Sequence, residues 1–153
     1  MGRFIRRGKS KFRFAPTIAV KAVPTRAEIA SSTALTTDIS DVGGFSISAD
    51  LADAPDLDSK FTKKVAGVDG IADSSLTFHD DDTTTAIRTA VAKGTPGFIL
   101  YFPYGDVPTK RMEVWPVEST GVNDQITAAN ETGKYVVTFA VTDTPAQGAV
   151  VPT

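Results

Sequence analysis

Short segments in which apolar and polar residues alternate recur along this chain of 153 residues. A period of two is typical of a β-strand with one buried face, because successive side chains point to opposite sides. Four segments show it: Phe45–Ala49, Asp73–Asp80, Arg111–Val117 and Lys134–Thr142. The pattern therefore predicts a mainly β protein.

Three further strands are predicted on other grounds. Thr17–Val23 and Phe61–Val65 are short and rich in β-branched or aromatic residues, which favour strands. Gly97–Pro103 is apolar on both faces, so we expect it to be central and buried.

The clearest predicted helix spans about Thr83–Lys93. Ile87 and Val91 lie at helical spacing, and acidic residues Asp80–Asp82 precede the segment, where they suit the helix dipole. Gly94 follows and can adopt the left-handed conformation that ends a helix.

The remaining segments are predicted to be short or irregular. Thr25 and Glu28 have capping-box spacing, which indicates one helical turn near Arg26–Ala30. Ser31–Asp41 is predicted as a loop with an extended piece at Leu35, Ala52–Asp58 as a loop or sheet edge, and Val68–Gly70 as a turn.

These elements predict a single domain, with no repeat that would indicate a solenoid or propeller. The expected fold is an antiparallel β-sandwich or barrel with one flanking α-helix and extended N- and C-terminal arms. We expect residues 1–16 to form a basic arm, 17–143 the β-sandwich domain, and 144–153 an extended tail.

The charged residues are distributed unevenly. Eight basic residues and no acidic ones occur up to Arg26. All 18 acidic residues lie beyond Arg26, and Glu28 is the first of them. The arm also holds four large apolar residues, Phe4, Ile5, Phe12 and Phe14. It could bind a polyanion, contact the acidic surface of a neighbouring copy, or remain a solvated terminus. The apolar residues weigh against the last of these, because they would gain nothing without docking.

The sequence offers little support for catalysis. It has no cysteine and a single histidine, which excludes thiol chemistry and histidine-rich metal sites. His79 precedes Asp80–Asp82 and could form a His–Asp unit or bind a metal, but a surface histidine beside helix-capping acids is the favoured interpretation. We expect no enzyme activity, no catalytic residues and no cofactor or metal site.

Two other clusters have alternative interpretations. Asp50, Asp53, Asp56 and Asp58 could bind calcium, but they lack the EF-hand order, so a charged loop is favoured. Trp115 with two tyrosines, Tyr101 and Tyr104, could form a sugar-binding platform, but packing in the core is favoured. No apolar run approaches the roughly 20 residues that a membrane span needs.

Ordered sequence patterns over most of the chain from Pro24 resemble the major tail proteins, or tail tube proteins, of long-tailed, non-contractile bacteriophages, especially those of actinobacterial hosts. The segments that carry the resemblance are Pro24–Ile29, Val42–Ser46, Asp73–Phe78, Asp80–Asp82, Ile87–Arg88, Lys93–Thr95, Gly97–Ile99, Pro103–Asp106, Met112–Val117 and Phe139–Asp143.

The resemblance implies a structural virion protein, made in the host bacterial cytoplasm and located in the phage tail. It implies hexameric rings that stack into a tube through loops and terminal arms. DNA would pass through the channel without specific binding, and an acidic wall would keep it from adhering. The expected partners are other copies of the chain and other phage tail proteins, with no membrane.

On this interpretation we expect the arm and the Asp50–Phe61 loop to supply contacts between subunits or rings, and removal of residues 1–13 to leave a folded domain that stacks poorly. The candidate contact residues are Phe4, Arg6, Arg7, Phe12, Arg13, Asp53, Asp56, Asp58, Lys60 and Phe61. The alternatives are a small nucleic-acid-binding module that uses the basic arm and a glycan-binding sandwich that uses the aromatic residues.

Overall fold

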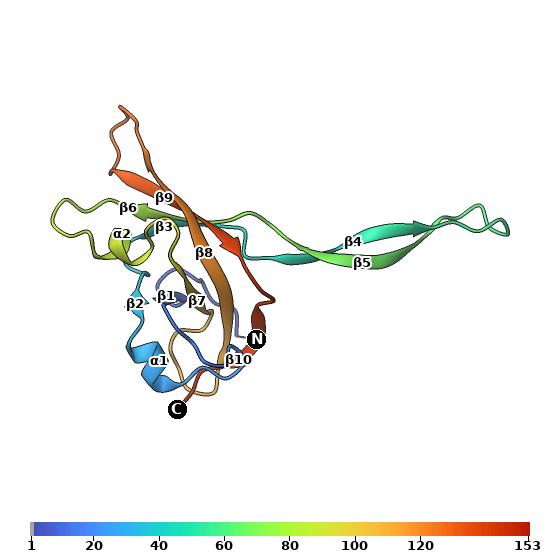
Figure 1. Ribbon diagram of the computed structural model, residues 1–153, viewed down its shortest axis with the longest axis horizontal. Helices are drawn as coiled ribbons and strands as arrows, with labels where there is room; N and C mark the ends of the chain where they lie inside the picture. Colours follow the sequence, from blue (N-terminus) through green and yellow to red (C-terminus); the bar gives the residue numbers. More distant parts are fainter. Residues whose placement is uncertain (1) are drawn as a thin grey trace.

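The computed structural model describes residues 2–153, in which strands predominate and two short helices occur. Figure 1 shows the arrangement. The strands are β1 Lys11–Ala15, β2 Thr33–Ala34, β3 Ile39–Gly43, β4 Ile47–Ala54, β5 Lys63–Ile71, β6 Ser74–His79, β7 Pro96–Phe102, β8 Arg111–Gln125, β9 Lys134–Val141 and β10 Ala146–Val150; the helices are α1 Arg26–Ala30 and α2 Ala86–Ala90.

Within residues 2–153, eight of the strands form one antiparallel sheet. Its order is β2-β1-β7-β8-β9-β6-β3, and β10 pairs with the first part of β8. The other two strands, β4 and β5, pair only with each other. The predicted mainly β, antiparallel fold is therefore confirmed.

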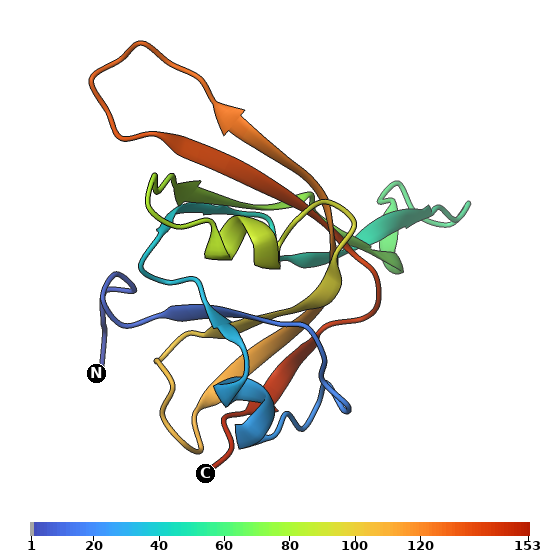
Figure 2. The ribbon, with the colours of Figure 1, turned by 60° about the vertical axis from the view of Figure 1, so that its left-hand side comes forward.

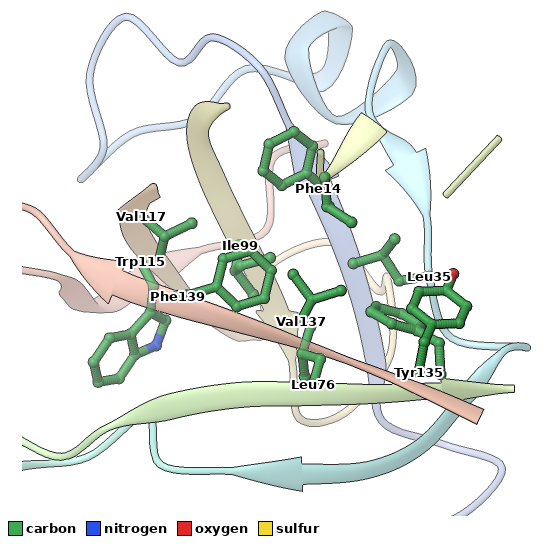
Figure 3. Packing of buried hydrophobic residues seen from close by; sticks show 11 residues of the cluster. Phe14, Leu35, Leu76, Ile99, Trp115, Val117, Tyr135, Val137 and Phe139 are labelled. Atoms are coloured by element: carbon green, nitrogen blue, oxygen red, sulfur yellow. The ribbon is translucent and has the colours of Figure 1, made fainter. Parts of the chain in front are cut away.

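The main sheet curls around its principal core. Phe14 on β1 belongs to the same buried cluster as Leu76 on β6, although the two strands lie toward opposite ends of the sheet. Figure 3 shows Phe14, Ile99, Trp115 and Val137 pointing into this cluster. A curved sheet thus buries its concave face without needing a second sheet.

A second core lies on the other face of β7 and β8. Leu100, Met112 and Val114 are buried there against Ile29 of α1 and Val151 beyond β10. Because alternate residues of β7 enter the two cores, both of its faces are apolar, and the prediction of a central buried strand is confirmed.

The capping box predicts α1 correctly. The Glu28 amide donates to the Thr25 hydroxyl at 3.2 Å, and the Thr25 amide donates to the Glu28 carboxylate at 2.8 Å. The Ala19 amide adds a second bond to that carboxylate at 2.7 Å. Backbone donation from Thr25, and then from Ala19, lowers the pKa of Glu28 below its ordinary value.

The predicted helix over Thr83–Lys93 is wrong at its ends, because α2 covers only Ala86–Ala90. Thr83 donates both its amide and its hydroxyl to the Asp81 carboxylate, a local alternative to helical hydrogen bonding. Gly94 does adopt a positive φ of 85° after the helix.

The end of the predicted N-terminal arm lies inside the sheet. Residues Lys11–Ala15 form β1, which pairs with β7 from Lys11 opposite Phe102 to Ala15 opposite Phe98. Phe14 and Ala15 are buried in the two cores. Removal of residues 1–13 would therefore damage the fold as well as any docking contact.

The predicted strand Thr17–Val23 is wrong, and the strand in this part of the chain is β1, which precedes it and pairs with β7. The segment is irregular and contains a turn in which the Val23 amide donates to the Val20 carbonyl at 3.0 Å. Within the predicted extended tail, Ala146–Val150 forms strand β10 and pairs with β8.

The predicted turn Val68–Gly70 is strand, and for Ala52–Ala54 the sheet-edge alternative applies and not the loop. Val68–Gly70 lies inside β5, and β4 continues to Ala54. Within Ser31–Asp41, where a loop was expected, the short strand β2 and the start of β3 occur.

A sharp bend at Gly44 and Phe45 turns the chain out of the main sheet and into β4. Both residues have positive φ angles, 77° and 56°. The Phe45 ring is held edge-to-face against Trp115, with centroids 5.5 Å apart, and this packing offsets the strain of its backbone. A Cβ at position 44 would lie 2.2 Å from the Asp73 carbonyl oxygen, so only glycine fits there.

We expect Gly44→Ala to lower the free energy of unfolding by about 2 kcal/mol or more, because it adds left-handed strain to a backbone clash. Denaturant unfolding measures this. Gly148→Ala is the matched control, since its Cβ would meet nothing within 4 Å. Equal stability of the two variants would contradict this account of the bend.

Candidate assembly surface

The β4–β5 hairpin projects away from the body of the protein (Figures 1 and 2). It forms a separate sheet of two strands, with register running from Ile47 opposite Ile71 to Ala54 opposite Lys63. A break in register at Gly67–Val68 places two residues of β5 opposite Asp50. The bend at Gly44 thus leads into a long ribbon with solvent on both faces.

Large apolar side chains are exposed along this ribbon. Leu51 is 64% exposed, Phe61 74% and Leu57, at the tip, fully exposed. From the register, Ile47, Leu51 and Ile71 share one face of the ribbon. An isolated two-stranded hairpin is marginally stable in water, and contiguous exposed apolar surface marks interaction sites. The ribbon therefore needs a partner surface.

Two of the four charged candidate residues of the hairpin, Asp53 and Asp56, form ion pairs with lysines of β5. Lys64 contacts the Asp53 carboxylate at 2.6 Å, and Lys63 contacts Asp56 at 3.1 Å. Both pairs are exposed, so they add little stability. They do neutralise two lysines and two of the acidic residues that the sequence singled out.

Three of the N-terminal candidate residues, Arg6, Arg7 and Phe12, line a cavity that is also lined by Gly44 and Phe45 at the base of the hairpin. The chain turns at Arg6–Lys9, where the Ser10 amide donates to the Arg6 carbonyl at 2.8 Å. The Arg6 guanidinium donates to the Tyr101 hydroxyl at 2.6 Å, while Phe4 packs against Tyr104 with centroids 5.4 Å apart.

The other N-terminal candidates have partners within their own chain. Arg13 donates to the Ser32 hydroxyl at 2.6 Å and to the Ser32 carbonyl at 2.8 Å. The Phe12 ring stacks on Tyr101 with centroids 4.8 Å apart. These contacts give Phe12 and Arg13 a role in holding β1 in place, while Arg7 is exposed.

A cavity of about 450 Å³, here called the arm cavity, lies between the N-terminal turn and the base of the hairpin. Its aromatic lining comes from four residues of separate strands and turns, Phe12, Phe45, Tyr101 and Trp115. Arg6 and Arg7 supply positive charge, and Glu113 supplies negative charge. Arg111 lies 3.6 Å from the Glu113 carboxylate, and Gln147 donates to it at 3.3 Å.

The sequence patterns predicted neither the arm cavity nor a second projection, which the ends of β8 and β9 form. The predicted strand ended at Val117, whereas β8 runs to Gln125 and leads to Ile126, which is 95% exposed. Three residues in this continuation, Gly121, Asn123 and Asp124, are weak strand formers, which hides the strand from pattern-based prediction.

Comparison with known proteins settles the family. A family model described as phage tail tube protein matches residues 1–153. The chain belongs to the phage tail tube proteins. This places it in the virion, as a structural component of the phage tail, and agrees with the resemblance in the sequence.

Solved structures support the fold of this tail tube protein. One similar chain comes from the cryo-EM structure of the anti-feeding prophage (AFP) baseplate, 6-fold symmetrised. It superposes with a TM-score of 0.64 at 6% identity, covering 94% of this chain and 95% of that one. A second match, to the SPP1 Dit protein, has a TM-score of 0.40 at 12% identity and covers 85% of this chain but 48% of that one, which is too distant to support an argument. No curated protein sequence matches significantly.

The polar and aromatic side chains around His79 contact one another in this family member. His79 Nδ1 lies 2.9 Å from the Thr132 hydroxyl. Nearby, the Arg88 guanidinium stacks 4.2 Å above the Tyr135 ring and pairs with Asp80 and Asp124. Burial raises the pKa of Tyr135, and the hydrogen bond to Asp124 raises that of Arg88. The contacts join α2 to β8 and β9.

The glycan-binding alternative loses support in this tail tube protein. Trp115 is 1% exposed, so it cannot form the exposed platform that glycan binding requires. Among residues 2–153, no group of three histidine, cysteine or acidic residues is arranged to hold a metal ion. Neither helix in this range is long and apolar enough to cross a membrane.

We expect the amides of β4 and β5 to exchange with deuterium much faster than those of β7 and β8 in the monomeric protein, because the ribbon lacks a buried face. Hydrogen-exchange mass spectrometry tests this, and assembly should then protect the ribbon. Equal protection of the ribbon and β8 in a verified monomer would show that the ribbon is stable without a partner.

Proposed function

We propose that this chain self-assembles into hexameric rings that stack into the tube of a non-contractile phage tail, the conduit for DNA ejection. The mechanism is assembly of subunits. Its partners are other copies of the chain and other tail proteins, and DNA passes through the channel without specific binding.

The observation that carries the proposal is the exposed β4–β5 ribbon. A single subunit leaves Leu51, Val65 and Val68 more than half exposed on a two-stranded sheet. Full burial of a valine or leucine side chain contributes about 1.5–3 kcal/mol of stabilisation relative to full exposure. Contact with a neighbouring subunit would supply that burial, and six copies arranged in this way would close a ring. The 6-fold symmetrised AFP baseplate supports this number through the shared fold.

The charge distribution supports a channel that does not bind DNA. Beyond Arg26 the chain carries all 18 acidic residues and only eight basic ones. In the hairpin, Lys63 and Lys64 are already paired with Asp56 and Asp53. An acidic wall repels the phosphate backbone and lets a duplex move without adhering.

The basic segment has limited capacity to act as the nucleic-acid site of the alternative function. Arg13 is bonded to Ser32, Lys21 contacts Asp143 at 2.9 Å, and Arg26 contacts Asp106 at 2.8 Å. Half of its eight basic residues, with Arg6 included, thus have partners in the chain itself. These contacts favour a role in holding the fold together.

We expect the purified protein to form hollow rings or tubes as its concentration rises, visible by negative-stain electron microscopy and by light scattering after size exclusion. Replacing Leu51, Val65 and Val68 together with threonine removes this exposed apolar surface from the ribbon and keeps residues that favour strands. This variant should fold normally and remain monomeric. Tubes of normal form from it would contradict the role of the ribbon.

A wild-type protein that stays monomeric at every concentration and binds duplex DNA in a steeply salt-dependent way would instead support the nucleic-acid-binding function. Duplex DNA binding should therefore be measured alongside the microscopy. An Arg6→Gln, Arg7→Gln double variant tests whether the arm is responsible for any binding.

We expect removal of residues 2–8, which retains β1, to leave a folded protein that makes fewer or shorter tubes, because the exposed arm supplies contacts between rings. Thermal unfolding checks the fold, and tube lengths measured in micrographs check stacking. The matched control is truncation of Pro152 and Thr153 at the other terminus. Unchanged tube lengths after the arm deletion would remove the arm from the stacking interface.

A further inference from the structure

We propose that the hairpin tip of one copy, residues 55–61, inserts into the arm cavity of the next copy. The inference rests on the proposed self-assembly and names the two surfaces that meet. Leu57 and Phe61 would enter the cavity, and Arg7 of the receiving copy would contact Asp58 of the inserted tip.

The apolar surfaces of the tip and the cavity match in character. Leu57 is fully exposed and Phe61 is 74% exposed, so both are available for docking. The arm cavity has an aromatic lining, and its volume of about 450 Å³ lies within the range of roughly 300–1,000 Å³ found for sites that hold small ligands. It therefore has room for two apolar side chains.

The geometry excludes insertion of a tip into the cavity of its own chain. Gly44 and Phe45, at the base of the hairpin, line the arm cavity. The eight residues of β4 then carry the chain about 26 Å away, at about 3.3 Å per residue. Figure 1 shows the ribbon pointing away from the body. The occupant is thus the tip of another copy.

The charges that remain without ion-pair partners are complementary. Asp53 and Asp56 are paired with lysines, whereas Asp58 and Lys60 form no ion pair within residues 2–153. In the same range Arg7, which lines the cavity, forms no ion pair either. Asp58 can therefore approach Arg7 when the tip enters the cavity. Charge complementarity of this kind fixes the orientation of docking.

The proposed contact joins two different patches, so each copy both donates a tip and receives one. A contact between unlike patches generates a closed ring when the rotation permits closure and an open filament otherwise. It also explains why the bend at Gly44 is constrained, because that bend sets the direction in which the tip is presented.

Engineered disulfides test the contact directly, since the natural chain has no cysteine to interfere. We expect a Leu57→Cys and Val42→Cys double variant, and a second with Thr36→Cys in place of Val42→Cys, to give a ladder of cross-linked oligomers when assembled protein is mildly oxidised. Val42 and Thr36 both line the cavity. The control pairs Leu57→Cys with Val150→Cys, an exposed position on β10.

The three outcomes of this experiment are distinct. A ladder in either cavity variant and none in the control supports the contact. Tubes that form normally in both cavity variants but give no ladder overturn it and leave the proposed function intact. A wild-type protein that never assembles contradicts the proposed function and the contact together.

A charge swap provides a second test that does not depend on cysteine geometry. Asp58→Arg and Arg7→Asp should each raise the protein concentration needed for assembly by about tenfold or more. The double variant should restore assembly toward the wild-type concentration, because the pair is re-formed between copies. Additive loss in the double variant, with normal thermal unfolding, overturns the Asp58–Arg7 contact.

Discussion

Strand β8 holds the whole body together, because it pairs with three strands and contributes side chains to both cores. Its first part lies between β7 and β10, and its second part pairs with β9. Met112 and Val114 enter one core, while Trp115 and Val117 enter the other. The alternation of a single strand therefore fixes how the two layers of side chains sit relative to each other.

Within the residues that the structure describes, the β4–β5 ribbon pairs with no strand of the main sheet, so that sheet's pairing does not stabilise it. The chain leaves the main sheet after β3 and returns at β6, which pairs with β3 and β9. Between them the ribbon satisfies its own backbone hydrogen bonds but buries little apolar surface. A rigid body with an unpartnered, apolar projection is suited to assembly, where the missing burial comes from a neighbour.

The bend at Gly44 and Phe45 couples these two parts. Phe45 packs against Trp115 in the core, so the direction of the ribbon depends on core packing rather than on a flexible linker. The same residues line the arm cavity. Presentation of the tip and the shape of the receiving cavity are consequently set by one cluster of aromatic side chains.

Local patterns in the sequence predicted the parts of the protein that depend on local physics. The alternation in Asp73–Asp80 and Lys134–Thr142 identified β6 and β9, and the capping box at Thr25 and Glu28 identified α1. The ordered patterns from Pro24 onward also identified the family.

Pairing between distant segments decided the rest. Lys11–Ala15 is a strand because it pairs with β7, whereas the β-branched segment Thr17–Val23 pairs with no strand in the described part of the chain. Val68–Gly70, which has the composition of a turn, became strand because β4 lay opposite it. The arm cavity combines residues from Arg6 to Trp115. Sequence patterns report backbone preference and the side of a strand that is buried, whereas partners, edges and cavities depend on which distant segments meet, and only the tertiary structure determines that.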